Sequence, residues 1–357
     1  MMKAKITMLV IVSSALFEVT SSKLSLPTPS GAFKVGTVQT KLIDHNRVDP
    51  YAPDTQKRSL MIQFLYPAKH SDHYSVTPYM PEATAQYISQ LHGLPNNTLQ
   101  TIQTQAHLGA PIAHYNPPVV LFSHGLGATR YLYTSLLSDI ASRGYLVVSI
   151  DHPYDAGIVE FPDGKVIKGT VSRNKTDDEA NKALNVRSQD VKFVLDQLNT
   201  SKIRKQIPGL RNRLDVHQVA MFGHSFGGAT TAAAMLNDNR IIAGANLDGS
   251  FWGPVVDKGL DRPFLIMSRS QRDRSTEASW AKIWPKLRSW RLQLQLANSN
   301  HFTYSDLPVV VNLLKLTSPS LEPIILYFVT SWILSCNNLT AGSQKFHLNI
   351  KLKYNLD

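Results

Sequence analysis

The amino-acid sequence predicts an α/β fold, with a mostly parallel central sheet and helices on both faces. Two observations support this prediction. Short apolar runs, each of the length of a buried strand, alternate along the chain with longer segments of helical periodicity. Such alternation is typical of βαβ units, which place helices over both faces of a parallel sheet. The 357 residues contain no repeat and no low-complexity block, so we expect one large domain over residues 35–320.

The strands are predicted from apolar runs bounded by glycine, proline or polar residues. In chain order they are 59–68, 119–122, 145–152, 217–222, 241–248, 262–267 and 292–298. Helical spacing of apolar residues predicts helices over 131–140, 176–199, 227–236 and 275–284. The second of these helices opens with Thr176, an N-cap residue followed by acidic residues in the first turn. Insertions at 78–112 and 154–178 are expected over the carboxyl edge of the sheet.

The two ends of the chain differ from the predicted domain. Residues 1–22 have two lysines, then an apolar stretch, then small polar residues, which is typical of a secretory signal peptide. A buried first helix or an uncleaved anchor is the alternative. Residues 23–34 are rich in Pro, Ser and Gly and are expected as a linker, whereas 321–357 form an atypical tail whose last part alternates as a strand does. Secretion is therefore predicted for this chain.

Two further features agree with a secreted chain. Sequons for N-glycosylation occur at Asn96, Asn174, Asn199 and Asn338. Cys336 is the single cysteine, so no disulfide can form within the chain. We therefore expect a glycosylated protein that tolerates an oxidising compartment without using it.

The formal net charge of +11 raises the question of an anionic partner. The densest basic cluster, between Lys202 and Arg213, precedes a predicted strand, where a solvated loop is expected. No zinc-ligand spacing, phosphate-binding loop or RNA-binding signature accompanies it. We expect a solvated surface there, with a role at a lipid surface as the alternative, no nucleic-acid partner, and no metal.

A serine lies at the junction of a predicted strand and a predicted helix. Gly223-His224-Ser225-Phe226-Gly227 follows the apolar run Gln218–Phe222 and precedes an alanine-rich run. This pattern in this setting is typical of the nucleophile elbow of α/β-hydrolases, in which a sharp turn presents the serine hydroxyl. The alternative is a tight glycine turn with an idle serine.

A serine nucleophile requires a histidine base and a carboxylate that orients it. In α/β-hydrolases the chain order is serine, acid, histidine, each at the carboxyl end of a strand. Asp248 and Asp273 both meet this condition, although Asp273 has arginines around it and an alternative role in a surface ion pair. His301 is the one histidine between Asp273 and the tail. The residues alone leave the choice of acid open.

An oxyanion hole requires two backbone N–H groups directed into the site. One is expected from Phe226, the residue after the serine. The other is expected from Leu126, which has a glycine on each side in the turn after the strand 119–122. The alternative for this second segment is a tight turn without a catalytic role.

These residues give the chain a resemblance to a known family. The segments "FSHGLGATRYLYT", "RSQDVKFVLDQLN", "GHSFGGAT", "NLDG" and "HFTYSD" are similar to those of the platelet-activating factor acetylhydrolases of the plasma type, which have the α/β-hydrolase fold. The resemblance implies Asp248 as the acid, with Asp273 as the alternative, and His301 as the base. It also implies hydrolysis of a short or oxidised sn-2 acyl ester of a glycerophospholipid, with no metal or cofactor.

The expected partner is thus a phospholipid substrate, met at a membrane or lipid-particle surface, and the oligomeric state is left open. The segment after Asp248 and the segment before His301 differ from the family pattern, as does the tail. Two alternatives therefore stay open. One is a general carboxylesterase, lipase or dienelactone-hydrolase-like enzyme acting on another ester. The other is a non-catalytic lipid-binding member of the fold.

Overall fold

The computed structural model of the chain describes residues 24–95, 97–113, 116–173 and 175–316. Within them, ten strands form one sheet in the order β12-β11-β10-β9-β5-β6-β2-β1-β4-β3. The strands from β6 to β12 in this order all run parallel, and β2 runs antiparallel to β6. The predicted sheet, large and mostly parallel, is confirmed.

The elements have the following bounds. The sheet contains β1 Lys34–Val48, β2 Lys57–Ala68, β3 Val76–Pro78, β4 Gln103–Leu108, β5 Val119–Ser123, β6 Leu146–Asp151, β9 Val219–His224, β10 Ile241–Leu247, β11 Phe264–Ser268 and β12 Arg291–Gln295. A separate hairpin contains β7 Ile158–Glu160 and β8 Val166–Lys168. The helices are α1 Glu82–His92, α2 Thr98–Thr101, α3 Thr134–Ser142, α4 Asp177–Gln197, α5 Ser201–Gln206, α6 Phe226–Asn237, α7 Pro254–Lys258, α8 Ala278–Ile283 and α9 Leu307–Leu313.

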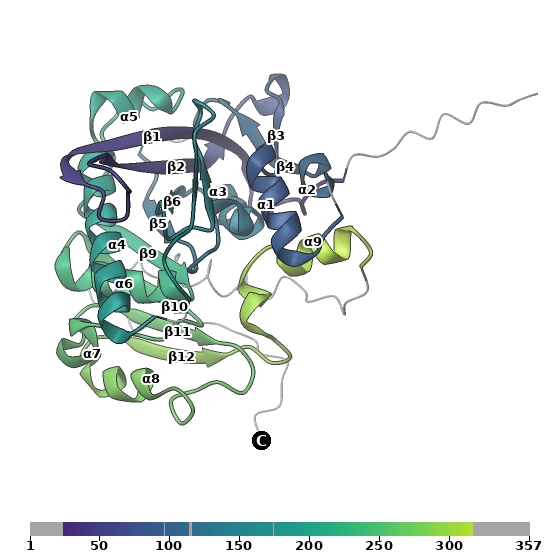
Figure 1. The fold of residues 1–357 in the computed structure, drawn as a ribbon. Coiled ribbons are helices and arrows are strands. Elements are labelled where there is room, and N and C mark those ends of the chain that lie inside the picture. Colours follow the sequence, from purple (N-terminus) through teal and green to yellow (C-terminus); the bar gives the residue numbers. More distant parts are fainter. Residues whose placement is uncertain (1–23, 96, 114–115, 174, 317–357) are drawn as a thin grey trace, which may run out of the picture.

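Helices cover both faces of the sheet (Figure 1). Residues of α4 to α8 share one hydrophobic core with alternate strand residues such as Leu121 and Met221. Residues of α1, α3 and α9 share a second core with the intervening strand residues, such as Phe122 and Phe222. Because the central strands are buried on both faces, their sequences read as continuous apolar runs rather than as alternating ones. This explains why the sequence analysis found these strands.

The strand β1 was not predicted. Burial alternates along much of its 15 residues, but the buried positions include the polar residues Thr37, Thr40 and Asp44, so the sequence shows neither a continuous apolar run nor a regular alternation of apolar and polar residues. It pairs antiparallel with β2 from Lys34 opposite Ala68 onward. β3 and β4 continue the sheet beyond β1, so part of the insertion at 78–112 extends the sheet instead of lying over its edge.

The predicted helix at Thr176 begins as expected. The Thr176 hydroxyl accepts a hydrogen bond from the Glu179 amide, and the Glu179 carboxylate accepts one from the Thr176 amide. This reciprocal capping box satisfies two N–H groups that the first helical turn leaves without intrahelical acceptors. The predicted helix over 131–140 begins later, because 130–133 form a 3-10 turn before α3.

The described part of the expected linker, 24–33, packs against the domain. Leu26 is buried, and its amide donates to the carbonyl of Gln103 in β4. Ser30 donates to Asp139 of α3 through both its amide and its hydroxyl. The predicted signal peptide and the tail from 321 lie outside the described residues. No helix in the described part is both long and apolar enough to cross a membrane.

A buried arginine joins three segments on the α4 side. Arg58 of β2 forms ion pairs with Asp49 at 2.9 Å and with Asp190 of α4 at 2.7 Å, and all three side chains are at most 4% exposed. The guanidinium also donates to the carbonyl of Pro153, after β6. Burial alone would raise the pKa of Asp190, but the charge of Arg58 and the hydrogen bond from His152 outweigh it and hold this pKa well below its usual range.

A buried carboxyl joins α3 to α9 on the other face. Asp306, at the start of α9, accepts hydrogen bonds from the Ser135 amide and from the Tyr79 hydroxyl, each at 3.2 Å. Its own amide donates to the carbonyl of Leu132. Burial raises the pKa of Asp306 to about 7. Asp306 therefore anchors the segment that leads from His301 into α9.

Replacement of Arg58 should strongly destabilise the fold. Arg58→Met leaves the buried Asp49 without its cation and leaves Asp190 with Arg47 as its remaining cation, and we expect the free energy of unfolding to fall by about 3–5 kcal/mol. Lys192→Met is the matched control, because Lys192 forms an ion pair with Asp196 but its side chain is 62% exposed. The control should lose less than about 1 kcal/mol. Urea denaturation of both variants measures this, and equal losses would contradict the assignment.

The pKa of Asp306 predicts a pH-dependent stability. Between about pH 4 and pH 7 the folded state retains a proton that the unfolded state has released, so the stability falls as the pH rises through this window and then levels off. Asp306→Asn removes this titration. From pH 5 to pH 8, the wild type should therefore lose on the order of 2–3 kcal/mol relative to the variant. Urea denaturation at each pH tests this, and parallel stability curves would refute it.

Candidate active site

Ser225 occupies the sharp turn between β9 and α6, with φ 56° and ψ −122°. A side chain rarely tolerates positive φ, so this backbone is strained. The two glycines of the motif permit the turn. A Cβ on Gly223 would lie 2.3 Å from the carbonyl oxygen of Gly227, and a Cβ on Gly227 would lie 1.9 Å from the carbonyl oxygen of Ser123. The strand-turn-helix setting inferred for this motif is therefore present.

The structure brings Ser225, Asp248 and His301 together at the carboxyl edge of the sheet. His301 Nε2 lies 2.9 Å from Ser225 Oγ, and His301 Nδ1 lies 2.5 Å from Asp248 Oδ2. Asp248 directly follows β10, and His301 begins a 3-10 turn after β12. With the proton on Nδ1, the ring donates to the carboxylate and its other nitrogen accepts the hydroxyl proton of Ser225. This is an arrangement that can activate a serine hydroxyl.

Two arginines hold the carboxylate of Asp248. Arg269 Nη1 donates to Oδ2 at 2.9 Å, and Arg272 Nη1 donates to Oδ1 at 3.1 Å. The side chain of Asp248 is fully buried. Burial alone would raise its pKa, but the hydrogen bond from His301 and the charges of Arg272 and Arg269 outweigh burial and lower this pKa well below its usual range. Asp248 is therefore ionised at neutral pH.

Asp273 lies apart from His301. Its carboxylate accepts hydrogen bonds from the Ser275 amide and hydroxyl and from the Thr276 amide, as in a local Asx turn. Two of the arginines near it in the sequence, Arg269 and Arg272, form hydrogen bonds with Asp248 instead. Of the two candidate acids, the structure thus brings only Asp248 to the histidine.

Leu126 and Phe226, the residues whose amides are expected in the oxyanion hole, both line the cavity beside Ser225. Neither amide donates to any acceptor in the described part of the chain, whereas the adjacent amides of Gly125, Gly127 and Ser225 all do. Phe226 is the first residue of α6, whose positive dipole end therefore lies at the same place. Two free N–H groups at this position can stabilise a negative oxygen.

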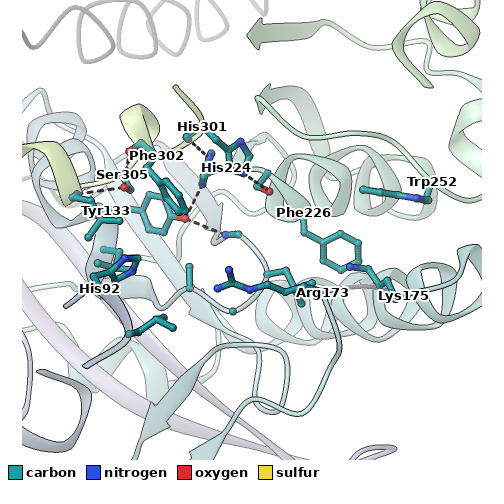
Figure 2. Close-up of a pocket in the computed structure, with 18 residues that line it drawn as sticks. His92, Tyr133, Arg173, Lys175, His224, Phe226, Trp252, His301, Phe302 and Ser305 are labelled. Atoms are coloured by element: carbon teal, nitrogen blue, oxygen red, sulfur yellow. Dashed lines mark hydrogen bonds between the residues drawn. The ribbon is translucent and has the colours of Figure 1, made fainter. Parts of the chain in front are cut away.

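A cavity of about 310 Å³ opens in front of Ser225 (Figure 2). One part of its wall is apolar and includes Leu91, Phe302 and Leu307. Another part carries the cationic residues Arg173 and Lys175. Leu91 comes from α1, and Arg173 and Lys175 come from the segment before α4, so the inserted segments at 78–112 and 154–178 do reach the carboxyl edge. Among the described residues, no group of three or more His, Cys, Asp or Glu side chains can hold a metal ion.

His224, the residue before the serine, links the base to the Leu126 turn. Its Nε2 lies 2.9 Å from the carbonyl oxygen of His301, and its Nδ1 lies 2.9 Å from the hydroxyl of Tyr133. The same hydroxyl accepts the Gly125 amide. Burial, together with the positive charge that His301 can carry, lowers the pKa of His224 to about 3. A neutral His224 thus donates to the His301 carbonyl and accepts from Tyr133.

A buried arginine supports the same turn from below. Arg187 of α4 donates through Nη1 to the carbonyl oxygen of His124 at 2.6 Å, and its guanidinium lies 4.9 Å from the centroid of the Phe226 ring. It also forms an ion pair with Asp155. Arg187 therefore contacts both segments that carry the free amides: the turn with Leu126, through the carbonyl of His124, and Phe226, through its ring.

A second serine–histidine–aspartate set lies in this buried region. His152 Nε2 is 3.1 Å from Ser123 Oγ, and His152 Nδ1 is 2.9 Å from Asp190 Oδ2. All three side chains are fully buried. Burial and the charge of Arg187 lower the pKa of His152 to about 4. Since no substrate reaches Ser123, this set acts as a structural network.

Arg187, Arg269 and Arg272 belong to the site but were not predicted from the sequence. Arg187 carried a signal, because a charged residue on the apolar face of a predicted helix requires a buried partner. Arg269 and Arg272 carried none, since the sequence placed them equally near Asp273. Among the predicted glycosylation sites, Asn199 is half-buried and hydrogen-bonded to the backbone of Leu214, and the other three fall outside the described residues.

Comparison with known proteins identifies the family. The sequence model described as "Platelet-activating factor acetylhydrolase, isoform II" matches residues 18–317. A probable 1-alkyl-2-acetylglycerophosphocholine esterase of Arthroderma benhamiae is 31% identical over an alignment that covers 85% of this chain and 81% of that protein. The platelet-activating factor acetylhydrolase of Canis lupus familiaris is 24% identical, and the match covers 62% of this chain and 54% of the dog protein.

A solved structure extends this likeness to the fold. The ferulic acid esterase from Streptomyces cinnamoneus superposes with a TM-score of 0.74 and 28% identity, and the match covers 89% of this chain and 93% of that chain. The fold is thus that of the α/β-hydrolases, as the serine motif indicated, and the homologues are esterases. This chain is an enzyme of the same kind as the 1-alkyl-2-acetylglycerophosphocholine esterases, and it belongs to the platelet-activating factor acetylhydrolase family, isoform II.

Proposed function

We propose that this chain hydrolyses the acetyl or oxidised short sn-2 ester of platelet-activating-factor-like glycerophospholipids, with Ser225, His301 and Asp248 as its catalytic residues. The observation that carries the proposal is the continuous hydrogen-bonded path from Ser225 Oγ through the His301 ring to the Asp248 carboxylate. The names of the family and of its relatives support the substrate class. A cavity of about 310 Å³ is near the small end of ligand sites and favours a short acyl group.

The reaction proceeds in two halves. Ser225 Oγ attacks the ester carbonyl carbon while His301 Nε2 takes the hydroxyl proton, and the Leu126 and Phe226 amides stabilise the resulting oxyanion. The bond to the sn-2 oxygen then breaks, and His301 returns its proton to that oxygen, which releases the lysophospholipid. Water then attacks the acyl carbon while His301 takes a proton from it. The bond between the acyl carbon and Ser225 Oγ breaks, His301 returns the proton to Oγ, and the acid product leaves. Asp248 stays ionised and stabilises the imidazolium formed in each half.

The amino-terminal features extend the proposal to the location of the enzyme. We propose that the chain is secreted after loss of a signal peptide over residues 1–22, and that it carries N-linked glycans. Two sequence features support this: the lysine-flanked apolar stretch at the amino terminus and the four sequons. We further propose that the enzyme meets its substrate at a membrane or lipid-particle surface. Secretion from a eukaryotic host, followed by amino-terminal sequencing and glycosidase treatment, tests the first two points.

Loss of the nucleophile or the base should remove most of the rate. Ser225→Ala and His301→Ala should each lower kcat on the order of 10⁴-fold or more, and the double variant should be little worse, because the two groups act as a unit. Ester hydrolysis by the purified protein measures the rate. A fluorophosphonate probe should label the wild type at Ser225. An unlabelled, folded wild-type protein would instead favour a lipid-binding role.

Substitutions of the two aspartates should differ clearly in their effect on kcat. Asp248→Asn should lower kcat on the order of 10⁴-fold, because the amide no longer fixes the histidine tautomer. Asp273→Asn is the matched control and should change kcat less than about 3-fold, as expected for a surface turn away from the histidine. The opposite ranking would show that the acid has been assigned to the wrong residue, although a serine esterase would remain.

A substrate panel distinguishes this activity from that of other esterases. We expect the sn-2 acetyl phospholipid to be hydrolysed faster than the long-chain sn-2 analogue and faster than methyl ferulate. Equal rates on the acetyl and long-chain phospholipids would exclude the short-chain assignment. A preference for methyl ferulate would favour a general carboxylesterase, the activity class of the Streptomyces cinnamoneus protein.

A further inference from the structure

Two cations lie beside the two free amides of the active site. Arg173 lies against Gly127, next to Leu126: a Cβ added to Gly127 would lie 3.1 Å from Arg173 Nη2. Lys175 Nζ lies 4.4 Å from the centroid of the Phe226 ring. One positive charge therefore lies next to the Leu126 turn, and the other lies next to the Phe226 ring. Figure 2 shows both side chains on the opposite side of the cavity from His301.

Among the described residues that line the cavity there are two cations and no carboxylate. Apart from three histidines and Tyr133, Arg173 and Lys175 are the ionisable side chains among its lining residues. In the described part of the chain, neither cation forms a salt bridge, in contrast to Arg58 and Arg187. Arg173 also acts on His92, another residue of the cavity wall: burial and the charge of Arg173 together lower the pKa of His92. These two cations are thus available to an anionic ligand.

The segment that carries the cations is fixed at both ends. Before Arg173, the amides of Thr170 and Val171 both donate to the carbonyl of Tyr154. After Lys175, the capping box of Thr176 begins α4. Lys175 is half-buried, and burial lowers its pKa. A charge that is partly removed from water binds an anion more strongly than a fully solvated charge does.

The substrate class places an anion at this position. In a glycerophospholipid, five bonds of about 1.5 Å join the sn-2 acyl carbon to the phosphorus, so the two atoms lie less than about 8 Å apart. With the acyl carbon at Ser225, the phosphate must therefore lie close to the two amides, and the other wall, with Leu91, Phe302 and Leu307, is apolar. The Phe226 and Trp252 rings, which would suit a quaternary ammonium, already lie within 6 Å of Lys175 Nζ.

We propose that Arg173 and Lys175 form a subsite for the phosphate of the substrate, and that the amine of the headgroup points away into solvent. This inference rests on the proposed function and narrows it: the enzyme selects esters that carry an anionic phosphate diester next to the acyl group. Arg173 and Lys175 are specificity-determining residues here, and Ser225 chemistry does not require them.

The test compares two substrates that differ only in the phosphate headgroup. They are a short-chain 1-alkyl-2-acetylglycerophosphocholine and the matching 1-alkyl-2-acetylglycerol, both kept below their critical micelle concentrations. The readout is the ratio of their kcat/KM values. In Arg173→Gln/Lys175→Gln, this ratio should fall about 10- to 100-fold, mainly through KM of the phosphate substrate. The wild-type ratio should also fall with added salt, and the ratio of the variant should not.

Matched controls separate a phosphate subsite from a general effect of charge. Lys202→Gln/Arg213→Gln removes the same charge from exposed positions outside the cavity and should keep the wild-type ratio. Arg173→Lys/Lys175→Arg should retain most of it. Melting temperature and fluorophosphonate labelling establish that each variant is folded. If the double glutamine variant does not fold, the ratio is measured in two single variants, Arg173→Gln and Lys175→Met. The methionine retains the packing of the side chain on Phe226.

Each outcome decides between the possibilities. An unchanged ratio in the double variant, with a wild type that hydrolyses both substrates, overturns the subsite and leaves the proposed function standing. An equal loss of kcat/KM on both substrates also overturns the subsite, because such a loss would mean that the cations maintain the shape of the turn that carries Leu126. A difference seen only on anionic vesicles overturns it in favour of surface binding. A wild type that hydrolyses neither substrate overturns the proposed function itself.

Discussion

The charge state of one buried carboxylate governs the rest of this site. Asp248 has no exposed side-chain surface, and a carboxyl in that position would ordinarily hold its proton. Arg269 and Arg272 come from the loop after β11 and keep it ionised. An ionised Asp248 accepts a hydrogen bond from the protonated Nδ1 of His301, so the unprotonated Nε2 can accept one from the Ser225 hydroxyl. Loss of either arginine therefore acts on the serine through two intermediates rather than by direct contact.

Buried charges also position the turn that carries Leu126. Arg187 of α4 holds the His124 carbonyl and packs on Phe226, and Arg58 and Asp190 join α4 to β2. These groups lie in the sheet–helix interface, where an unpaired charge would cost several kcal/mol. Each charge has a partner, so the network fixes the direction of the turn instead of weakening the fold. His224 and Tyr133 add a neutral connection from this turn to the base loop.

The sequence predicted the central sheet and the three residues that converge, for identifiable physical reasons. The central strands are buried on both faces, which produces continuous apolar runs, and a serine between two glycines at a strand–helix junction has few alternative explanations. β1 was not predicted because polar residues such as Thr40 and Asp44 occupy buried positions in it, so its sequence shows no continuous apolar run. The residue pattern by itself left the choice between Asp248 and Asp273 open, since both follow strands, and the resemblance to the family implied Asp248. The choice depends on which carboxylate the loop after β11 leaves in contact with His301, and this is a tertiary property.

The buried Ser123–His152–Asp190 set has a consequence for how such sites are recognised. Its atomic connectivity repeats that of Ser225–His301–Asp248 with similar separations, so a search by interatomic distance alone returns two matches in one chain. What differs is access: an ester must approach the oxygen along a line that leaves room for its leaving group, and Ser123 is enclosed on all sides. Any template used to annotate hydrolases should thus weigh the solvent exposure of the hydroxyl together with its hydrogen bonds.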